Sequence, residues 1–219
     1  MTKNTIIPET PSSAAYEASQ NRGPIPDVAN PFGLFHDWLA AARTSELNDS
    51  NAMALSTVDA DGLPDVRMVL LKHVSEAGFT FYTHETSAKG QQLLANPKAA
   101  LLFHWKSQRR QVRIRGHVEH GHDEAADIYF ASRARVSRIG AWASNQSQPL
   151  ESPAALQAKL AEAQARFGET GNVPRPPNWR GYCLIPESIE FWQDQPYRLH
   201  DRVLFTRQGE DWTKGRLNP

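Results

Sequence analysis

The sequence predicts a mainly β fold with peripheral α-helices, arranged as an antiparallel barrel. Short segments rich in β-branched and aromatic residues recur between residues 52 and 120, and one helical pattern interrupts them. A second series of such segments closes the chain from residue 179 onwards. The 219 residues are 40% hydrophobic and 22% charged, which is enough apolar material for one packed core.

We expect a flexible N-terminal arm over residues 1–29, which are rich in Pro, Ser, Asn and Ala and show no sustained periodicity. Residues 30–219 are expected to form one domain. Its first helix is predicted to begin at Asn30 and Pro31, an N-cap followed by proline in the first turn. Apolar residues at helical spacing continue this helix to about Arg43.

Five strands and one short helix are predicted between residues 52 and 120. Turn-forming residues separate the strands, and the helix ends at Asn96 because the residue before a proline disfavours helical backbone. The predicted strands are 52–58, 65–72, 79–84, 98–106 and 110–120.

The second half of the chain is predicted to add two helices and three closing strands. Both helical segments, 123–136 and 153–167, are dense in helix-forming residues, and the proline-rich segment 168–178 is expected to be a loop. The predicted closing strands are 179–193, 202–208 and 212–217.

Composition and missing motifs exclude several classes of protein. Lys plus Arg and Asp plus Glu both total 24, and the resulting net charge of zero argues against a general nucleic-acid binder. No apolar run approaches the roughly 18–20 residues that cross a bilayer, and without an apolar signal core we expect a cytoplasmic protein. The single Cys183 excludes an intrachain disulfide. Dinucleotide, P-loop, zinc-protease and serine-hydrolase motifs are absent, and the cluster His117, His120 and His122 is interpreted as a solvated strand end, so no metal site is predicted.

Four polar groups in otherwise apolar sequence are the candidates for a binding site. In the first, Arg67 and Lys72 flank a strand but differ in parity, so only a bulge or a strand end would bring both to one side; otherwise they are solvated strand ends. The second, FYTHETSAK (81–89), leads from a strand into a helix start. Free backbone N–H groups, hydroxyls and Lys89 there suit a phosphate, although an ordinary N-cap by Thr86 or Ser87 explains the hydroxyls equally well.

The third and fourth groups combine arginine with other hydrogen-bond donors. On a continuous helix Tyr129, Arg133 and Ser137 share one face and suit a phosphate monoester, the alternative being the wet face of an amphipathic helix. Near the C-terminus three potential cations alternate, so we expect them on the same side of a strand, where they repel one another unless an anionic or electron-rich ligand offsets them. They are Arg198, His200 and Arg202.

Taken in this order, the four groups resemble the pyridoxine/pyridoxamine 5′-phosphate oxidase family. The matching segments are NPFGLFHDWL, RMVLLK, FYTHETSAKG, QVRIRGHVE, YFASR, SRIGAWASNQS, IEFWQ, RLHDR and RLNP, and they span residues 30–219. The resemblance implies an FMN-binding split β-barrel with a C-terminal dimerisation region. It also implies a homodimer whose two FMN sites are each lined by both subunits.

The resemblance further implies a reaction and a set of site residues. Pyridoxine 5′-phosphate or pyridoxamine 5′-phosphate would be oxidised by dioxygen to pyridoxal 5′-phosphate and H2O2, with NH3 released from the amine, as a hydride passes from substrate C4′ to flavin N5. The implied FMN contacts are Arg67, Met68, Val69, Leu70, Leu71, Lys72, Tyr82, Thr83, Lys89, Gln111, Gln146, Ser147, Trp192 and Arg202. The implied substrate contacts are Lys72, Tyr129, Arg133, Ser137, Arg198, Leu199 and His200, with Arg198 and His200 in the catalytic role beside the pyridine ring.

Two departures and two alternatives accompany the resemblance. Ala88 stands where the family usually has arginine, which predicts weaker FMN retention, and Arg180 occupies a usually small position. A phenazine-biosynthesis flavin oxidase would share the fold but act on a tricyclic carboxylate, whereas the set Tyr129, Arg133 and Ser137 favours a phosphate substrate. A flavin-binding or flavin-reductase-like protein of the same barrel is the other alternative.

Overall fold

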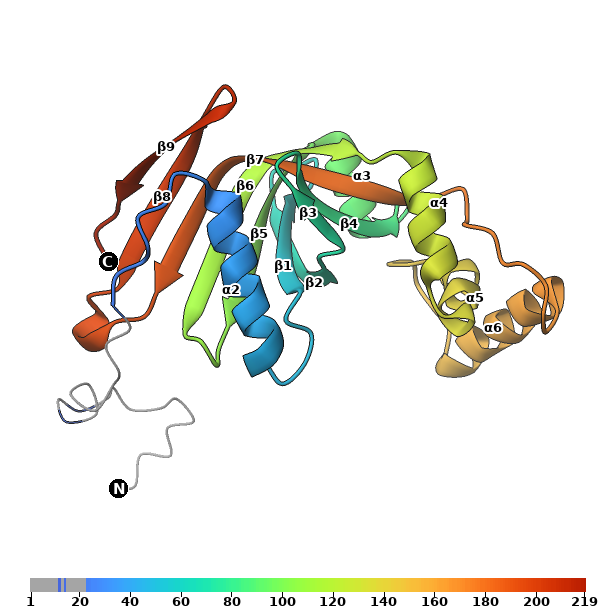
Figure 1. The fold of residues 1–219 in the computed structure, drawn as a ribbon. Coiled ribbons are helices and arrows are strands. Elements are labelled where there is room, and N and C mark those ends of the chain that lie inside the picture. Colours follow the sequence, from blue (N-terminus) through green and yellow to red (C-terminus); the bar gives the residue numbers. More distant parts are fainter. Residues whose placement is uncertain (1–11, 13, 15–22) are drawn as a thin grey trace, which may run out of the picture.

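Nine strands form one curled sheet in which every strand pairing is antiparallel (Figure 1). The computed structural model describes residues 12, 14 and 23–219. The strand order is β2-β1-β5-β6-β7-β4-β3, with β8 paired to β7 and β9 to β8. The strands are β1 Ala52–Val58, β2 Pro64–Leu70, β3 His73–Ser75, β4 Gly78–His84, β5 Lys98–Trp105, β6 Arg110–His120, β7 Trp179–Gln193, β8 Asp201–Gln208 and β9 Asp211–Arg216.

The long strand β7 connects the two ends of the molecule. Its first half pairs with β4 and its second half with β8, while β6 runs along its other edge. A register shift beside Gly116 lets β6 follow this curved strand, and a Cβ atom at Gly116 would lie 1.9 Å from the carbonyl oxygen of Ile185. At about 3.3 Å per residue, the ends of β7 lie roughly 46 Å apart along the strand.

The main core forms where helix α2 (Pro31–Ser45) packs across the sheet. The Asn30 side chain accepts a hydrogen bond from the backbone N–H of Phe32, as predicted for the N-cap. One turn later Phe35 is fully buried, with its ring centroid 5.0 Å from that of Phe79 and 5.1 Å from that of Phe103. These aromatic contacts fix the helix against β4 and β5.

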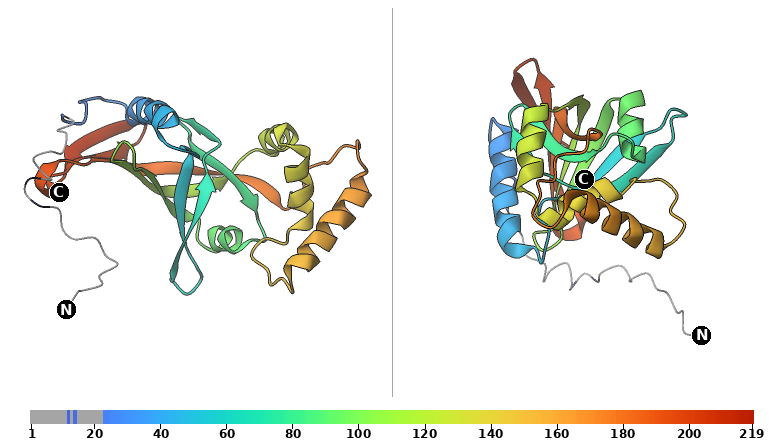
Figure 2. Two further views of the ribbon diagram at one scale, coloured as in Figure 1. Left: turned by 90° about the horizontal axis from the view of Figure 1, so that it is seen from below. Right: turned by 90° about the vertical axis from the view of Figure 1, so that its right-hand side faces the viewer.

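Three helices gather at the end of the sheet where β7 begins (Figure 2). They are α4 (Asp123–Ser132), α5 (Arg135–Ala143) and α6 (Pro153–Phe167), and α6 has the bounds predicted from the sequence. The prediction of one continuous helix over 123–136 is wrong, because Arg133 and Ala134 have extended backbone and divide it. Phe130 of α4 is buried beside Trp179, whereas α5 packs on α6. The break allows the two helices to run in different directions.

At the opposite end, residues 23–29 lie against the β8–β9 hairpin. Ile25 is buried in the main core, and its backbone N–H donates to the Asp201 carboxylate at 2.6 Å. The predicted arm began at residue 1 and included these positions. Residues 1–11, 13 and 15–22 of that prediction lie outside the described residues.

The predicted antiparallel β fold with helices around it is confirmed. Three details differ from prediction: strand β2 ends at Leu70 instead of continuing to residue 72, β3 is an additional short strand, and α5 is an additional helix. None of the helices in the described part of the chain is long and apolar enough to span a membrane.

Candidate functional site

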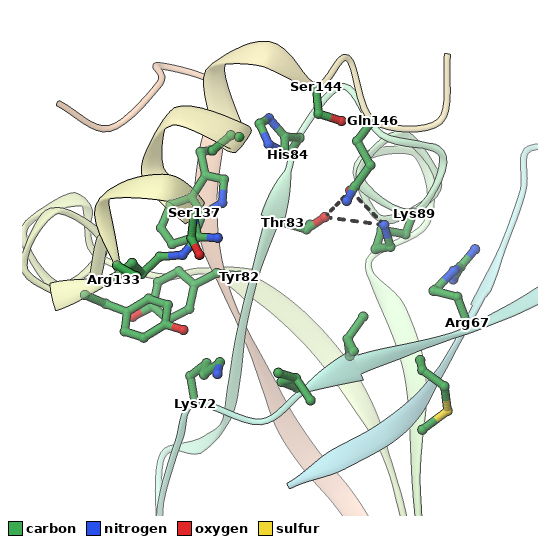
Figure 3. Close-up of a pocket in the computed structure, with 18 residues that line it drawn as sticks. Arg67, Lys72, Tyr82, Thr83, His84, Lys89, Arg133, Ser137, Ser144 and Gln146 are labelled. Atoms are coloured by element: carbon green, nitrogen blue, oxygen red, sulfur yellow. Dashed lines mark hydrogen bonds between the residues drawn. The ribbon is translucent and has the colours of Figure 1, made fainter. Parts of the chain in front are cut away.

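The main cavity, of about 710 Å³, lies between the β2 and β4 strands, the start of helix α3 (Ala88–Ala95) and the α4–α5 pair (Figure 3). It brings together three of the four polar groups that the sequence analysis singled out. The predicted site residues that line it are Arg67, Met68, Val69, Leu70, Lys72, Tyr82, Thr83, Lys89, Tyr129, Arg133, Ser137 and Gln146.

One end of the main cavity centres on Lys89, a buried lysine at the start of α3. Its Nζ donates to Gln146 Oε1 at 2.9 Å and lies 3.5 Å from Thr83 Oγ1, so both of its hydrogen-bond partners are uncharged (Figure 3). Burial lowers the pKa of Lys89, and the nearby charge of Arg67 lowers it further. A buried ammonium group held only by neutral partners favours the binding of an anion.

The residues around Lys89 also favour the binding of an anion. Ser87 is the N-cap of α3, and its hydroxyl accepts from the backbone N–H of Gly90 at 3.2 Å, so the predicted N-cap is confirmed. Arg67 contributes a second cation at this end, with its guanidinium held by Asp65 at 2.5 Å and by Gln92 at 2.9 Å. The helix start adds the positive end of its dipole.

Arg67 and Lys72 would point to opposite faces of a continuous strand, but β2 ends at Leu70, between them. Arg67 lies within the strand, whereas Lys72 follows its last residue, Leu70, and donates its backbone N–H to Thr80 O at 2.8 Å. Both side chains line the main cavity. The predicted condition for bringing them to one side, a strand end, is therefore met.

The other end of the main cavity centres on Arg133. Its guanidinium lies 5.4 Å from the ring centroid of Trp179, and its Nη1 is buried without a hydrogen-bond partner in the described structure. Burial lowers the pKa of Arg133, whereas Tyr129 opposes that shift. Lys72 Nζ lies over the Tyr129 ring at 5.6 Å. An unpaired guanidinium nitrogen in a cavity matches a phosphate or carboxylate oxygen.

Three stacked rings form the wall beside Arg133. The Tyr82 ring centroid lies 4.4 Å from that of Tyr129 and 4.9 Å from that of Trp179. Gly181 makes room for this stack, since a Cβ there would lie 3.0 Å from the Tyr82 ring. Trp179 and the buried His84 also line the main cavity. Trp179 was not predicted as a site residue, and His84 lies in the candidate group 81–89 without a predicted role of its own. They enter it through the pairing of β4 with β7, a long-range contact that no local pattern signals.

Other predicted residues lie far from the main cavity, at the opposite end of β7. Gln111, Trp192 and Arg202 line a second cavity of about 350 Å³, together with Glu190. Arg202 donates to Glu190 Oε1 at 2.7 and 2.9 Å. The side chain of Leu71 is buried in the core, and Ser147 is exposed after α5; neither lines the main cavity or the second cavity.

The prediction that Arg198, His200 and Arg202 share one side of a strand is wrong. Only Arg202 lies in β8, because Arg198 ends a short 3₁₀ turn (Pro196–Arg198) and has a φ of 60°. The predicted repulsion is also offset within the chain, since His200 lies 3.2 Å from Asp194 and Arg202 pairs with Glu190. The positions of these residues therefore do not by themselves require a ligand.

The Arg180 side chain, at a position expected to be small, is accommodated at the edge of the sheet. It lies 3.4 Å from the Glu85 carboxylate and 3.3 Å from that of Asp123, and so it links the ends of β4 and β7 to α4. These partly exposed ion pairs lie outside the main cavity and leave its lining unchanged.

Comparisons with known proteins fit this geometry. The family model described as "Pyridoxamine 5'-phosphate oxidase" matches residues 39–167, and that described as "Pyridoxine 5'-phosphate oxidase C-terminal dimerisation region" matches residues 179–219. Proteins named pyridoxine/pyridoxamine 5′-phosphate oxidase are similar to this chain along its length. That of Hyphomonas neptunium is 55% identical over 99% of both chains, and that of Maricaulis maris is 58% identical over 100% of both.

A solved structure shows the same fold. PhzG from Burkholderia lata 383, crystallised in complex with tetrahydrophenazine-1-carboxylic acid, matches with a TM-score of 0.82 at 31% identity. The match covers 93% of this chain and 96% of PhzG. With two family models spanning both halves of the sheet and relatives more than half identical, the chain belongs to the pyridoxamine 5′-phosphate oxidase family of split-barrel enzymes.

Proposed function

We propose that the protein is an FMN-dependent oxidase that converts pyridoxine 5′-phosphate or pyridoxamine 5′-phosphate to pyridoxal 5′-phosphate, with dioxygen as electron acceptor. The observation that carries the proposal is the presence of two separate cationic groups in one cavity. One surrounds Lys89 and the other surrounds Arg133 (Figure 3). A phosphorylated cofactor and a phosphorylated substrate would occupy one group each.

The group around Lys89 fits the phosphate of FMN. Two cations, Lys89 and Arg67, lie beside the Thr83 hydroxyl at a helix start. From there β2 residues 68–70 continue along the cavity toward Lys72 and offer an apolar surface for a flat ring system. Bound there, FMN would supply the hydride acceptor and the subsequent reaction with dioxygen that yields H2O2.

The group around Arg133 fits the phosphate ester of the substrate. Arg133 supplies charge and an unpaired buried donor, Tyr129 and Ser137 supply hydroxyls, and Lys72 adds a second cation. Anchoring the ester at this end would hold the substrate ring toward the β2 residues. The protein would thereby fix the C4′ carbon in the geometry that hydride transfer needs.

We assign the remaining predicted contacts to a second subunit. Trp192 and Arg202 line the second cavity, which shares no lining residue with the main cavity. Trp192 on β7 lies across β1, β5 and β6 from β2, roughly 19 Å away at about 4.8 Å per strand. The exposed side chains of Val66 and Met68 on β2 form an apolar surface beside the cavity, as expected for a surface that a partner covers. In the proposed homodimer the partner would contribute its Gln111, Trp192, Arg198, Leu199, His200 and Arg202 positions.

Oxygen consumption by the purified protein tests this function. With FMN added, we expect turnover of pyridoxine 5′-phosphate or pyridoxamine 5′-phosphate and none of the unphosphorylated vitamers at the same concentration, since Arg133 would lack its phosphate. A colourless protein that does not bind FMN would refute the cofactor. Turnover of a phenazine-type carboxylate in preference to both phosphates would instead favour the activity suggested by the similarity to PhzG.

A further inference from the structure

The loop after β7 holds a histidine between two groups of opposite hydrogen-bonding character. The His200 ring packs against Trp192 with centroids 4.5 Å apart. Its Nδ1 lies 3.2 Å from Asp194 Oδ1 and 3.3 Å from the backbone nitrogen of Gln195. An acceptor and a donor therefore both face this nitrogen, and its protonation state decides which of them it engages.

We propose that Asp194 is a positioning residue that keeps His200 in one orientation, with Nε2 presented as a hydrogen-bond donor to the substrate. When the ring is neutral, Nδ1 accepts from the Gln195 N–H, and the proton resides on Nε2. When the ring is cationic, Nδ1–H donates to Asp194 and Nε2 again carries a proton. In both states the nitrogen remote from the loop is a donor, so His200 does not act as a base through Nε2.

The backbone around this histidine is fixed from several directions. Arg109 donates from Nε and Nη2 to Asp194 Oδ2 at 2.5 Å, which leaves Oδ1 for His200. The Asp194 N–H in turn donates to the carbonyl of Arg109 at 3.0 Å, and Gln195 Nε2 donates to Gly23 O at 2.8 Å. Tyr197 and Arg198 both have φ near 60°, a conformation that costs free energy in non-glycine residues and persists only where the surroundings impose it.

Three cations and one carboxylate face His200. Burial lowers the pKa of His200, Asp194 raises it, and Arg198, Arg109 and Arg202 lower it further. Its ring neighbour Trp192 is uncharged. Without Asp194 the ring would be neutral over a wider pH range and would lose the group that accepts from the cationic form.

This inference rests on the proposed function in one respect, the substrate that Nε2 would contact. The arrangement of Asp194, Arg109 and His200 exists without any ligand, so it can be measured on its own. Histidine-selective isotope labelling of the full-length protein, with and without FMN, provides that measurement. The His200→Gln variant identifies the signal.

The test is an NMR titration of His200 combined with kinetics. We expect the neutral ring to carry its proton on Nε2, Asp194→Asn to lower its pKa by about one unit, and Arg109→Gln to raise it. Asp194→Glu should restore the wild-type value. A neutral ring protonated on Nδ1, or an unchanged pKa in Asp194→Asn, overturns the proposal.

Kinetics separate this inference from the proposed function. If pyridoxine 5′-phosphate is the substrate, kcat/KM should fall in Asp194→Asn and recover in Asp194→Glu, because the ring loses its positioning partner. The pH profile of kcat/KM should keep its position while the NMR pKa of His200 moves, because Nε2 donates in both protonation states. A limb of the profile that moves with the NMR pKa, or an unchanged kcat/KM in Asp194→Asn, overturns the role of His200 toward substrate. A wild-type protein without oxidase activity refutes the proposed function, whereas the titration still decides the position of the proton.

Discussion

Replacing Lys89 with methionine should have opposite effects on FMN binding and on the stability of the FMN-free protein. Lys89 is 8% exposed, and its ammonium group is held by Gln146 and Thr83, both uncharged. Without FMN, the cost of removing this charge from water is therefore only partly offset. Methionine has a similar length and fills the same space without that cost.

The two magnitudes follow from different interactions. A charge-assisted hydrogen bond to a phosphate contributes about 1.5–3 kcal/mol, so Lys89→Met should weaken FMN binding by about 10- to 150-fold. Relief of the desolvation cost should raise the unfolding free energy of the FMN-free protein by about 1 kcal/mol at neutral pH. General misfolding would instead lower both the FMN affinity and the unfolding free energy.

The stability difference should also depend on pH, with a defined sign. The folded-state pKa of Lys89 lies below its unfolded value of 10.5 because of burial and the charge of Arg67. Between the two values the unfolded chain binds more protons, so the stability of the wild type rises with pH through this window. The advantage of Lys89→Met should therefore shrink as the pH rises toward 10.5.

FMN titration followed by flavin fluorescence, and urea unfolding of the FMN-free protein between pH 7 and 10, measure both effects. Lys98→Met, at an exposed position on β5, is the matched control and should change neither FMN affinity nor the pH slope. Unchanged FMN affinity in Lys89→Met would refute the assignment of this end of the cavity to the cofactor phosphate. A lower stability at neutral pH would refute the desolvation argument.

Four further substitutions test other parts of the structure. Arg133→Ala should raise KM for the phosphorylated vitamer by about 10- to 100-fold in steady-state assays, with Arg133→Lys intermediate; equal KM values would remove Arg133 from the site. Gly181→Ala should lower the unfolding free energy by about 1–3 kcal/mol in urea, because its Cβ would lie 3.0 Å from the Tyr82 ring. Asn30→Ala removes an N-cap and should cost about 1 kcal/mol in the same assay while kcat stays at the wild-type value. Ala88→Arg should tighten FMN binding in a fluorescence titration, and an unchanged or weaker affinity would contradict the expectation that Ala88 limits FMN retention.

Local sequence signals were sufficient for most of the secondary structure. Asn30 and Pro31 begin α2, and the helix 153–167 and the strands 52–58, 110–120 and 179–193 have the predicted bounds. In each case the deciding signals lie within a few residues: a cap, a proline, a turn or a change of periodicity. At these positions tertiary packing did not shift the bounds of the helices and strands.

The helix break at Arg133 and Ala134 shows where local signals end. No glycine or proline marks the break, and residues 123–136 have helical composition. Just before the break Phe130 packs on Trp179, a residue 49 positions later in the chain, so the surroundings of the break are set by long-range contacts. The site residues Trp179 and His84 depend on the same long-range β4–β7 pairing, which the chain pattern does not encode locally.

The net charge of zero gave no indication of how the charges are distributed around the site. Charges near the C-terminus are balanced inside the chain, since Asp194 contacts both Arg109 and His200, and Glu190 contacts Arg202.

In the main cavity the balance is local and incomplete. Lys89 has two neutral hydrogen-bond partners, and Arg133 keeps a buried nitrogen without one in the described structure. Each is a small excess of positive charge on a buried or half-buried group, and an anion is bound more strongly there than by a fully solvated cation. Since the two excesses lie at opposite ends of one cavity, a single small anion does not reach both. Two phosphate-bearing ligands side by side, as proposed above, would place one phosphate at each end.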